Sequence, residues 1–416
     1  MPRFFGSKLP TLALLFCSAI CYQTPSLRAE DTEVQTGEVQ AAQDSAKDNS
    51  PAGTVSVSTL TAEPRRILQD LAQRGISFQT TLVNDWSKSL HQGIDTDGGF
   101  GRYSLDLSTT LDGKKLLGLT GTTGFVRLKQ HEQEFGGTYD GAAQVYSNID
   151  APSRTTLYEV WAQQEMLSGK LRFKAGKIDA TNEFATAATA ADFLNSSMGY
   201  SPTILGFPTY PDPKFGVNAF FRPVNGYGIG LGVFQTAGKG VLSMAEPSHI
   251  WSLGKGELPG RVSVGYWRLD GTLTRFDGSQ AANTQGFYSV LEQGLWRQSN
   301  PQGAEPRRLS AFLQLGRADG QISPFTQHLG GGMVLQAPFA GRPQDAIGIA
   351  ATHVQFSNQP GAGFDRQSEI ALESYYKMTF NRHLALVQDF QFIHNPGGLY
   401  ANADCPVITP RLVVSF

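Results

Sequence analysis

The sequence predicts an all-β fold, a transmembrane antiparallel β-barrel of about 16 strands, and three observations support it. Glycine supplies 46 of the 416 residues, while charged residues make up only 17%. Short alternating segments separated by turn residues recur along the chain, which is typical of a closed sheet. The connections also alternate in length, so short turns and long loops are expected on opposite sides of a membrane.

Residues 1–29 are predicted to be a signal peptide. Arg3 and Lys8 precede an apolar run from Leu9 to Cys21, which suits an export signal and is too short for a membrane-spanning helix. Cleavage after Ala29 would leave Cys405 as the only cysteine in the chain. No internal disulfide is therefore expected.

Two more segments precede the predicted barrel. Residues 30–60 are polar and lack apolar periodicity, which predicts a flexible leader. Residues 61–75 are expected to form a short helix at the barrel entrance, with Thr61 as N-cap and Gly75 as its stop. The barrel itself is predicted over residues 76–416.

Sixteen strand candidates follow Gly75, and most have the length that a tilted membrane strand needs. An even number is typical of outer-membrane barrels. The strands are expected to begin near Ile76, Gly101, Leu116, Thr155, Lys170, Phe215, Tyr227, Ser248, Gly260, Gln285, Arg308, Gln327, Gln344, Ser368, His383 and Val407.

The connections sort by parity. Even-numbered ones carry tight-turn sequences such as Asp112-Gly113, Ser168-Gly169 and Asn225-Gly226. Odd-numbered ones are mostly long, including Ala237–Pro247 and Ile178–Lys214. The Arg297–Arg307 connection is the exception, because it is long where a short turn is expected.

Alternation supports the same fold. In the last strand Ile408, Leu412 and the terminal Phe416 share one face, and Thr409 and Arg411 lie on the other. A soluble barrel would also alternate, with its apolar face inward. The signal peptide, the even strand number and the terminal aromatic residue favour lipid outside and a polar lumen. Glycines at every second position from 226 to 232 are interpreted as one face of a strand, not as a phosphate-binding loop.

The fourth and fifth strands are expected to present polar side chains to this lumen. Alternation places Leu157, Glu159, Trp161 and Gln163 inward and Tyr158, Val160 and Ala162 outward. In the next strand Arg172 and Lys174 point inward, so that they face Glu159 and Gln163. These groups either bind sugar hydroxyls or form a structural cross-strand ion pair.

The long Ile178–Lys214 connection is polar and aromatic, and it far exceeds an ordinary loop in length. We expect it to fold into the pore. Within it, Asn195, Ser196 and Ser197 either contact a sugar or form a capped turn. The seven histidines are scattered without a metal-binding motif, and 34 basic residues against 36 acidic ones lack the bias of a nucleic-acid binder.

Several runs resemble one known family, the carbohydrate-selective porins of the OprB type in Gram-negative outer membranes. They are TTLYEVWAQQEMLSGKLRFKAGKIDATNEFA, FLNSSMGYSPTI and YPDPKFGV, followed by the closing ITPRLVVSF. The resemblance implies a sixteen-stranded barrel, monomeric or homotrimeric, that passes mono- and oligosaccharides by diffusion without a cofactor. It also implies an inward-folded third outer loop and a Phe416 strand that engages the barrel-assembly machinery.

The resemblance and the strand parity together give a set of candidate constriction residues. Trp161 and Phe184 are expected to stack on a sugar ring, and the others to hydrogen-bond its hydroxyls. The set comprises Glu159, Trp161, Gln163, Arg172, Lys174, Lys177, Asp179, Asn182, Glu183, Phe184 and Asn195.

The expected partners are small sugars and outer-membrane lipid. A general or ion-selective porin is the main alternative function. An outer-membrane enzyme or an adhesin is the more remote alternative. The chain contains no GxSxG element, which is the nucleophile motif of many hydrolases.

Overall fold

The computed structural model describes residues 66–90, 99–133, 141–238, 240–254, 257–298 and 306–416. The predicted signal peptide, the predicted leader and Thr61 lie outside these ranges. Residues 66–73 form a helix beside the barrel, and Gly75 follows with a φ of 99°. Within the described ranges, no helix is long and apolar enough to cross a membrane.

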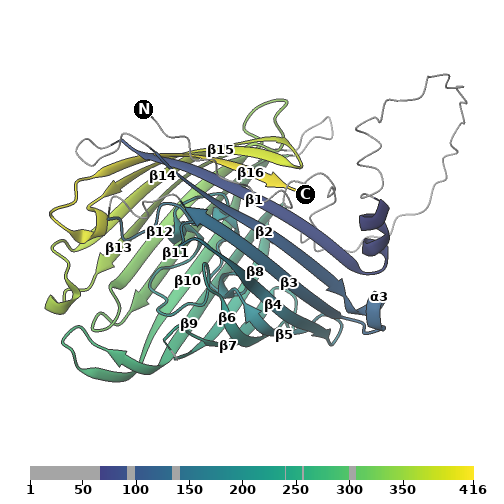
Figure 1. Cartoon of the computed structure of the whole chain (residues 1–416), viewed down its shortest axis with the longest axis horizontal. Coiled ribbons are helices and arrows are strands. Elements are labelled where there is room, and N and C mark those ends of the chain that lie inside the picture. Colours follow the sequence, from purple (N-terminus) through teal and green to yellow (C-terminus); the bar gives the residue numbers. More distant parts are fainter. Residues whose placement is uncertain (1–65, 91–98, 134–140, 239, 255–256, 299–305) are drawn as a thin grey trace, which may run out of the picture.

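Sixteen antiparallel strands close into one barrel in chain order (Figure 1). They are β1 (Ile76–Ser89), β2 (Phe100–Asp112), β3 (Thr122–Gln133), β4 (Arg154–Met166), β5 (Leu171–Ile178), β6 (Lys214–Phe221), β7 (Tyr227–Gln235), β8 (Val241–Leu253), β9 (Leu258–Thr274), β10 (Gln280–Gln298), β11 (Arg307–Ala318), β12 (Phe325–Gln336), β13 (Ala346–Phe356), β14 (Ser368–Asn381), β15 (Leu384–His394) and β16 (Cys405–Ser415).

The last strand closes the barrel against the first. Asp85 lies opposite Arg411 in the β1–β16 register. The terminal residue continues the pairing, because Phe416 N donates to Thr80 O at 2.8 Å and Thr80 N donates to Phe416 O at 3.0 Å. The chain therefore leaves no unpaired edge strand at this seam.

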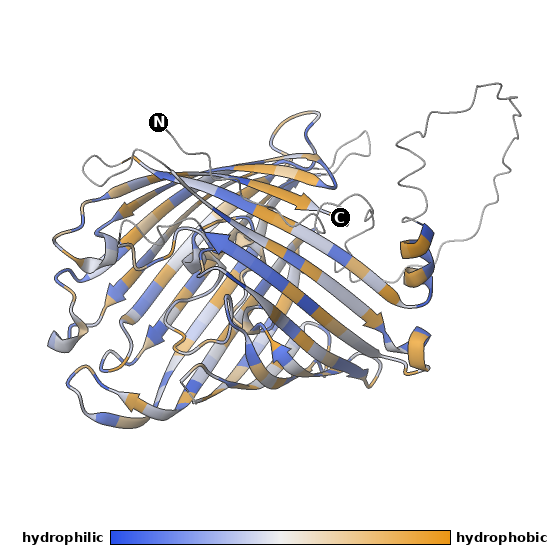
Figure 2. Ribbon diagram, viewed as in Figure 1, coloured by the Kyte–Doolittle hydropathy of each residue, from blue (hydrophilic) through white to orange (hydrophobic). Residues whose placement is uncertain are grey.

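The two faces of the wall differ in character. Large apolar side chains such as Leu107, Phe173 and Leu231 are exposed on the outside, while Thr409 and Gln391 are buried on the inside. Figure 2 shows the resulting alternation of apolar and polar bands along the strands. This arrangement matches a barrel with an apolar outer surface and a polar lumen.

The connection between β5 and β6 packs against the inner face of the wall. It contains the 3-10 helices η1 (Ala180–Asn182) and η2 (Ala188–Ala190) and the helix α4 (Ser196–Gly199). Phe184 belongs to one buried cluster with wall residues of β7 to β10, and Phe193 belongs to a second with residues of β10 to β15. Most of the buried apolar contacts of the barrel thus lie inside it, between this segment and the wall.

The glycine face of β7 makes room for this packing. A Cβ atom added at Gly232 would lie 2.8 Å from the ring of Phe184. Phe184 in turn packs against Phe220 and Phe234, with ring centroids 5.1 and 6.0 Å away. Gly228, Gly230 and Gly232 therefore share one face of a strand, as predicted, and this face points inward, whereas Gly226 lies in the turn before β7.

Three predicted strand starts were wrong by five to seven residues, and the smallest of these errors is at β10, which was expected from Gln285 but begins at Gln280. The strand expected from Leu116 begins at Thr122, because residues Gly113–Leu117 form the helix α3. Asp112 caps α3 by accepting hydrogen bonds from the backbone N–H groups of Lys114 and Lys115. The strand expected from Ser248 begins at Val241, so most of the predicted Ala237–Pro247 loop belongs to β8.

Pro247 explains why the start of β8 was predicted wrongly. It lies opposite Ile229 of β7, but the β8–β9 register skips it between Ala245 and Ser248. A proline has no N–H to donate, so it is tolerated in a strand where one ladder is interrupted. The sequence signal of a loop was in fact a local break in one ladder.

The predicted parity of β4 also needs correction at its start. The β3–β4 register shifts between Arg127 and Leu128, which oppose Glu159 and Leu157 respectively. Tyr158 is the extra residue and is buried at 1% exposure, whereas Leu157 is 44% exposed. A β-bulge thus reverses the alternation, so that Leu157 points outward and Tyr158 inward.

Candidate functional site

Glu159 connects the inner wall to the start of the β5–β6 connection. Its side chain is 2% exposed and lies 3.3 Å from the Arg127 guanidinium of β3. The backbone N–H of Asp179 donates to Glu159 Oε1 at 3.1 Å. Asp179 itself accepts hydrogen bonds from the Tyr158 hydroxyl and from Thr181 Oγ1. The β4 bulge is what brings Tyr158 and Glu159 to the same face.

Glu183 binds the two cations of β5. Arg172 Nη2 donates to one carboxylate oxygen of Glu183 and Lys174 Nζ donates to the other. The Glu183 side chain is only 1% exposed, whereas that of Arg172 remains 29% exposed. Both oxygens of the carboxylate are therefore engaged, while part of the Arg172 side chain remains exposed.

Aromatic rings lie beneath these cations. Lys174 Nζ sits 3.9 Å from the centroid of the Trp161 ring, and Arg172 Cζ sits 4.5 Å from that of Phe220. Trp161 also stacks on Phe125 of β3 at a centroid distance of 4.9 Å. Contacts between a cation and a ring face of this kind are attractive and restrict the cation's position.

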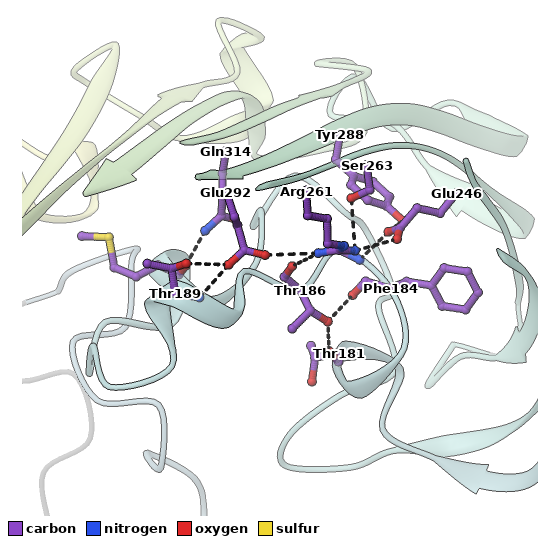
Figure 3. A network of polar contacts seen from close by, with 12 residues as sticks. Thr181, Phe184, Thr186, Thr189, Glu246, Arg261, Ser263, Tyr288, Glu292 and Gln314 are labelled. Carbon is purple, nitrogen blue, oxygen red and sulfur yellow. Dashed lines mark hydrogen bonds and ion pairs between the residues drawn. The ribbon is translucent and has the colours of Figure 1, made fainter. Parts of the chain in front are cut away.

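Arg261 holds the connection from the opposite wall (Figure 3). It donates to the Thr186 backbone carbonyl at 2.9 Å, to Glu246 at 3.1 Å and to Glu292 at 3.4 Å. The same two carboxylates accept backbone N–H groups of the connection, Glu246 from Ala185 at 2.8 Å and Glu292 from Thr189 at 2.6 Å. The Arg261 side chain keeps 27% exposure.

Glu373 of β14 anchors the middle of the connection. It accepts the backbone N–H groups of Leu194 at 2.5 Å and Asn195 at 3.2 Å. The side chain of Asn195 donates to Gln391 of β15 and caps α4 by accepting from Ser197 N. Buried acceptors on β4, β8, β10 and β14 thus fix the backbone of the connection around much of the barrel.

A common pattern emerges from these contacts. Arg127, Arg172 and Arg261 are each held by a buried glutamate, and each keeps between 27% and 29% of its side chain exposed. A guanidinium fixed in this way retains N–H donors that can bind oxygen atoms of a solute. Among the residues that the structure describes, no group of three or more His, Cys, Asp or Glu side chains is arranged to hold a metal ion.

One known family matches most of the chain. The family model described as "Carbohydrate-selective porin, OprB family" matches residues 102–416. The chain belongs to the OprB family. Porin B of Pseudomonas aeruginosa is 23% identical over 393 residues, which cover 79% of this chain and 85% of that protein. As an OprB-family barrel, the protein is an integral component of the Gram-negative outer membrane.

Solved structures agree on the fold. The high-pH structure of Pseudomonas putida OprB matches with a TM-score of 0.75 at 18% identity, over 85% of this chain and 97% of that one. The low-pH structure of the same protein matches with a TM-score of 0.57 at 18% identity, over 84% and 95% of the two chains. At this identity the similarity establishes the OprB-type barrel.

Three residues predicted for the constriction lie elsewhere in this OprB-family barrel. Phe184 and Asn195 are 0% and 1% exposed, so neither offers a surface to a sugar. The capped-turn interpretation of Asn195 is the correct one. Lys177 lies opposite Phe215, which is 56% exposed on the outside, and donates to the backbone carbonyl of Leu157. Lys177 shares the outward face of β5 with Phe173 and Ala175, so the regular alternation of the strand directs it away from the lumen.

The other candidates fall near one another. Gln163 lies opposite Lys174 in the β4–β5 register, and Asn182 is exposed beside Glu183. The predicted partners differ, however, because Arg172 and Lys174 bind Glu183 of the connection and not Glu159. Strand parity alone gives no information about a carboxylate that arrives from a loop.

Sequence reasoning missed Arg127, Arg261, Glu246, Glu292 and Glu373. All five occupy inward positions on strands whose side chains alternate between the two faces, so the parity rule that was applied to β4 and β5 could also have selected them. Their common role was not visible, because each glutamate binds a backbone N–H group that any residue type would supply.

One charged cluster lies at the rim where the connection rejoins the wall. Asp212 lies within 4 Å of the cationic groups of Arg154, Lys177 and Lys214. Burial opposes ionisation of this carboxyl, but the hydrogen bond from Lys214 and the surrounding positive charges outweigh it and lower the Asp212 pKa. Asp212 is therefore ionised at neutral pH.

Proposed function

We propose that this protein lets carbohydrates diffuse passively across the outer membrane through a constriction that the β5–β6 connection forms with strands β3, β5 and β9. The family assignment supports the substrate class. The observation that carries the constriction is the set of arginines, Arg127, Arg172 and Arg261, that buried glutamates hold in place with part of each side chain exposed.

Such a wall suits weak, multi-point binding. A solute that crosses a pore by diffusion must bind well enough to enter and weakly enough to leave. Fixed guanidinium donors together with Gln163 and the exposed Asn182 can replace part of the hydration of a sugar without trapping it. The constriction is held in place by Glu159, Asp179 and Glu183. Lys174 and Trp161 pack behind these carboxylates against the wall. The process makes and breaks no covalent bond, so it needs no catalytic residue and no cofactor.

Liposome swelling with purified protein tests this proposal. Neutral monosaccharides, neutral disaccharides and charged solutes of matched size are compared for the natural protein and for Arg172→Ala. Loss of one hydrogen-bond donor and of side-chain volume is expected to lower the ratio of monosaccharide to disaccharide entry by about threefold to tenfold. Arg222→Ala is the control, because Arg222 is exposed in the turn between β6 and β7.

The alternatives give different results. Equal entry of all solutes of one size, charged or neutral, would mean a general porin. Faster entry of ions than of matched sugars would mean an ion-selective one. A protein that inserts but admits no solute would revive the enzyme and adhesin alternatives.

A further inference from the structure

The outer surface of the barrel carries a groove that the channel function does not use. It crosses β9 to β13, has a volume of about 460 Å³, and is lined by Val264, Phe287, Ser289, Leu315, Arg317, Gln327, Leu329 and His353. Phe287, Leu315 and Leu329 are between 47% and 56% exposed. These side chains face outward, away from the lumen.

The strand registers arrange the lining in two rows. One row runs through Val264, Ser289, Leu315, Leu329 and His353, which are successive cross-strand partners from β9 to β13. The adjacent row runs through Tyr266, Phe287, Arg317, Gln327 and Gln355 in the same way. The first row is mainly apolar, and the second carries a cation and two amides.

Ser289 creates the hollow. On the outward face of β10 it lies between Phe287 and Leu291, and its cross-strand neighbours are Val264 and Leu315. All four neighbours are larger than serine. A single small side chain among large ones leaves a depression in an otherwise continuous apolar surface.

The polar row lies toward the rim of the barrel that carries the long connection. Arg317 is the next-to-last residue of β11, and the β5–β6 connection leaves from the end of β5. Both strands are odd-numbered in a barrel whose neighbours are all antiparallel, so they end at the same rim. Outer-membrane barrels place their longer loops on the cell exterior. The groove therefore faces the outer leaflet of the membrane.

Arg317 is available for a ligand. It is exposed, and none of the residues described in the structure forms a hydrogen bond or ion pair with its guanidinium. By contrast, Arg268 on β9 is engaged by Asp270 at 2.9 Å. A guanidinium can donate two parallel hydrogen bonds to two oxygens of one phosphate group. Arg317 lies where the apolar surface meets water, which is where the phosphate of a membrane lipid would lie.

We propose that this groove binds one lipid A moiety of lipopolysaccharide from the outer leaflet. One acyl chain lies in the depression over Ser289, between Leu315 and Val264. A glucosamine phosphate lies against Arg317, and Gln327 and His353 bind neighbouring polar groups of the headgroup. The inference is independent of which solute the channel passes.

Native mass spectrometry of the full-length mature barrel in detergent tests the site, with purified lipid A as the probe. The natural protein is expected to retain one lipid A molecule. Arg317→Gln is expected to bind it about tenfold more weakly, as loss of one charge-assisted contact implies. Ser289→Trp, which fills the depression, is expected to lose binding even though Arg317 is intact. Ser289→Ala and Arg222→Gln are the matched controls and are expected to bind normally.

Measurements with other lipids and of the oligomeric state show whether the groove binds lipid A, another lipid or a second copy of the chain. Lipid A without its phosphates is expected to bind as weakly to the natural protein as lipid A does to Arg317→Gln. Equal retention of phosphatidylglycerol, or equal binding by all variants, would overturn the proposal. So would a mass that corresponds to several copies of the chain and falls to one copy in Ser289→Trp, because a second copy would then occupy the groove.

Discussion

Asp85→Ala is expected to lower the free energy of unfolding by about 3–5 kcal/mol, because it leaves a buried guanidinium without its partner. Arg411 Nε and Nη2 donate to the two carboxylate oxygens of Asp85 at 2.7 and 2.8 Å, and the two side chains are 9% and 0% exposed. The pair lies in the register that joins β1 to β16. Urea unfolding in detergent micelles, followed by tryptophan fluorescence, measures the change.

The double variant Asp85→Ala/Arg411→Met separates the unpaired charge from the lost side-chain volume, because it keeps the Asp85 truncation but has no guanidinium. Removing both charges is expected to restore much of the stability, since an apolar replacement of a buried ion pair is often neutral. The same pair also holds a loop, because Ser147 Oγ donates to Asp85 at 2.7 Å and Arg411 donates to Asn148 at 2.8 Å. An Asp85→Ala protein as stable as the natural one would show that the seam does not depend on this pair.

Glu373→Ala is expected to loosen the β5–β6 connection and widen the pore. The change leaves the backbone N–H groups of Leu194 and Asn195 without their buried acceptor, at about 1–3 kcal/mol for each N–H. The connection then moves toward conformations in which water satisfies these groups. Single-channel conductance in planar bilayers is expected to rise, and disaccharides to enter liposomes faster than in the natural protein.

Glu132→Ala provides the matched control. Glu132 is an exposed glutamate on the outer face of β3 that accepts a hydrogen bond from the Tyr103 hydroxyl at 2.9 Å, whereas the connection packs inside the barrel. It is expected to change neither conductance nor solute size limits. If Glu373→Ala behaved like Glu132→Ala, the anchoring of the connection would have to rest on its apolar packing alone.

The sequence predicted the barrel well because membrane strands carry a simple signal. Alternating side chains such as Asp389 and Phe390, which are 2% and 43% exposed, report directly which face meets lipid. Turn residues added the parity of the connections. The predictions were wrong where a local feature interrupts the alternation: the bulge at Tyr158, the ladder break at Pro247 and the capped helix after Asp112.

The candidate site was predicted less completely, for a different reason. Arg172 and Lys174 were identified because they share one face of a strand. Their partner Glu183 was also selected, but its contact with them was not, since a loop residue has no register to a strand. Phe184 was expected to stack on a sugar, but its ring is buried against Gly232 of β7 and the rings of Phe220 and Phe234.

The effect of a neutral monosaccharide on ion current through single channels in planar bilayers tests most directly whether the constriction binds sugar. The sugar is expected to reduce the natural protein's current in a saturable way and to reduce that of Arg172→Ala more weakly, because the exposed part of the Arg172 side chain belongs to the binding wall. A current that the sugar leaves unchanged at every concentration would mean that the pore has no site for a carbohydrate.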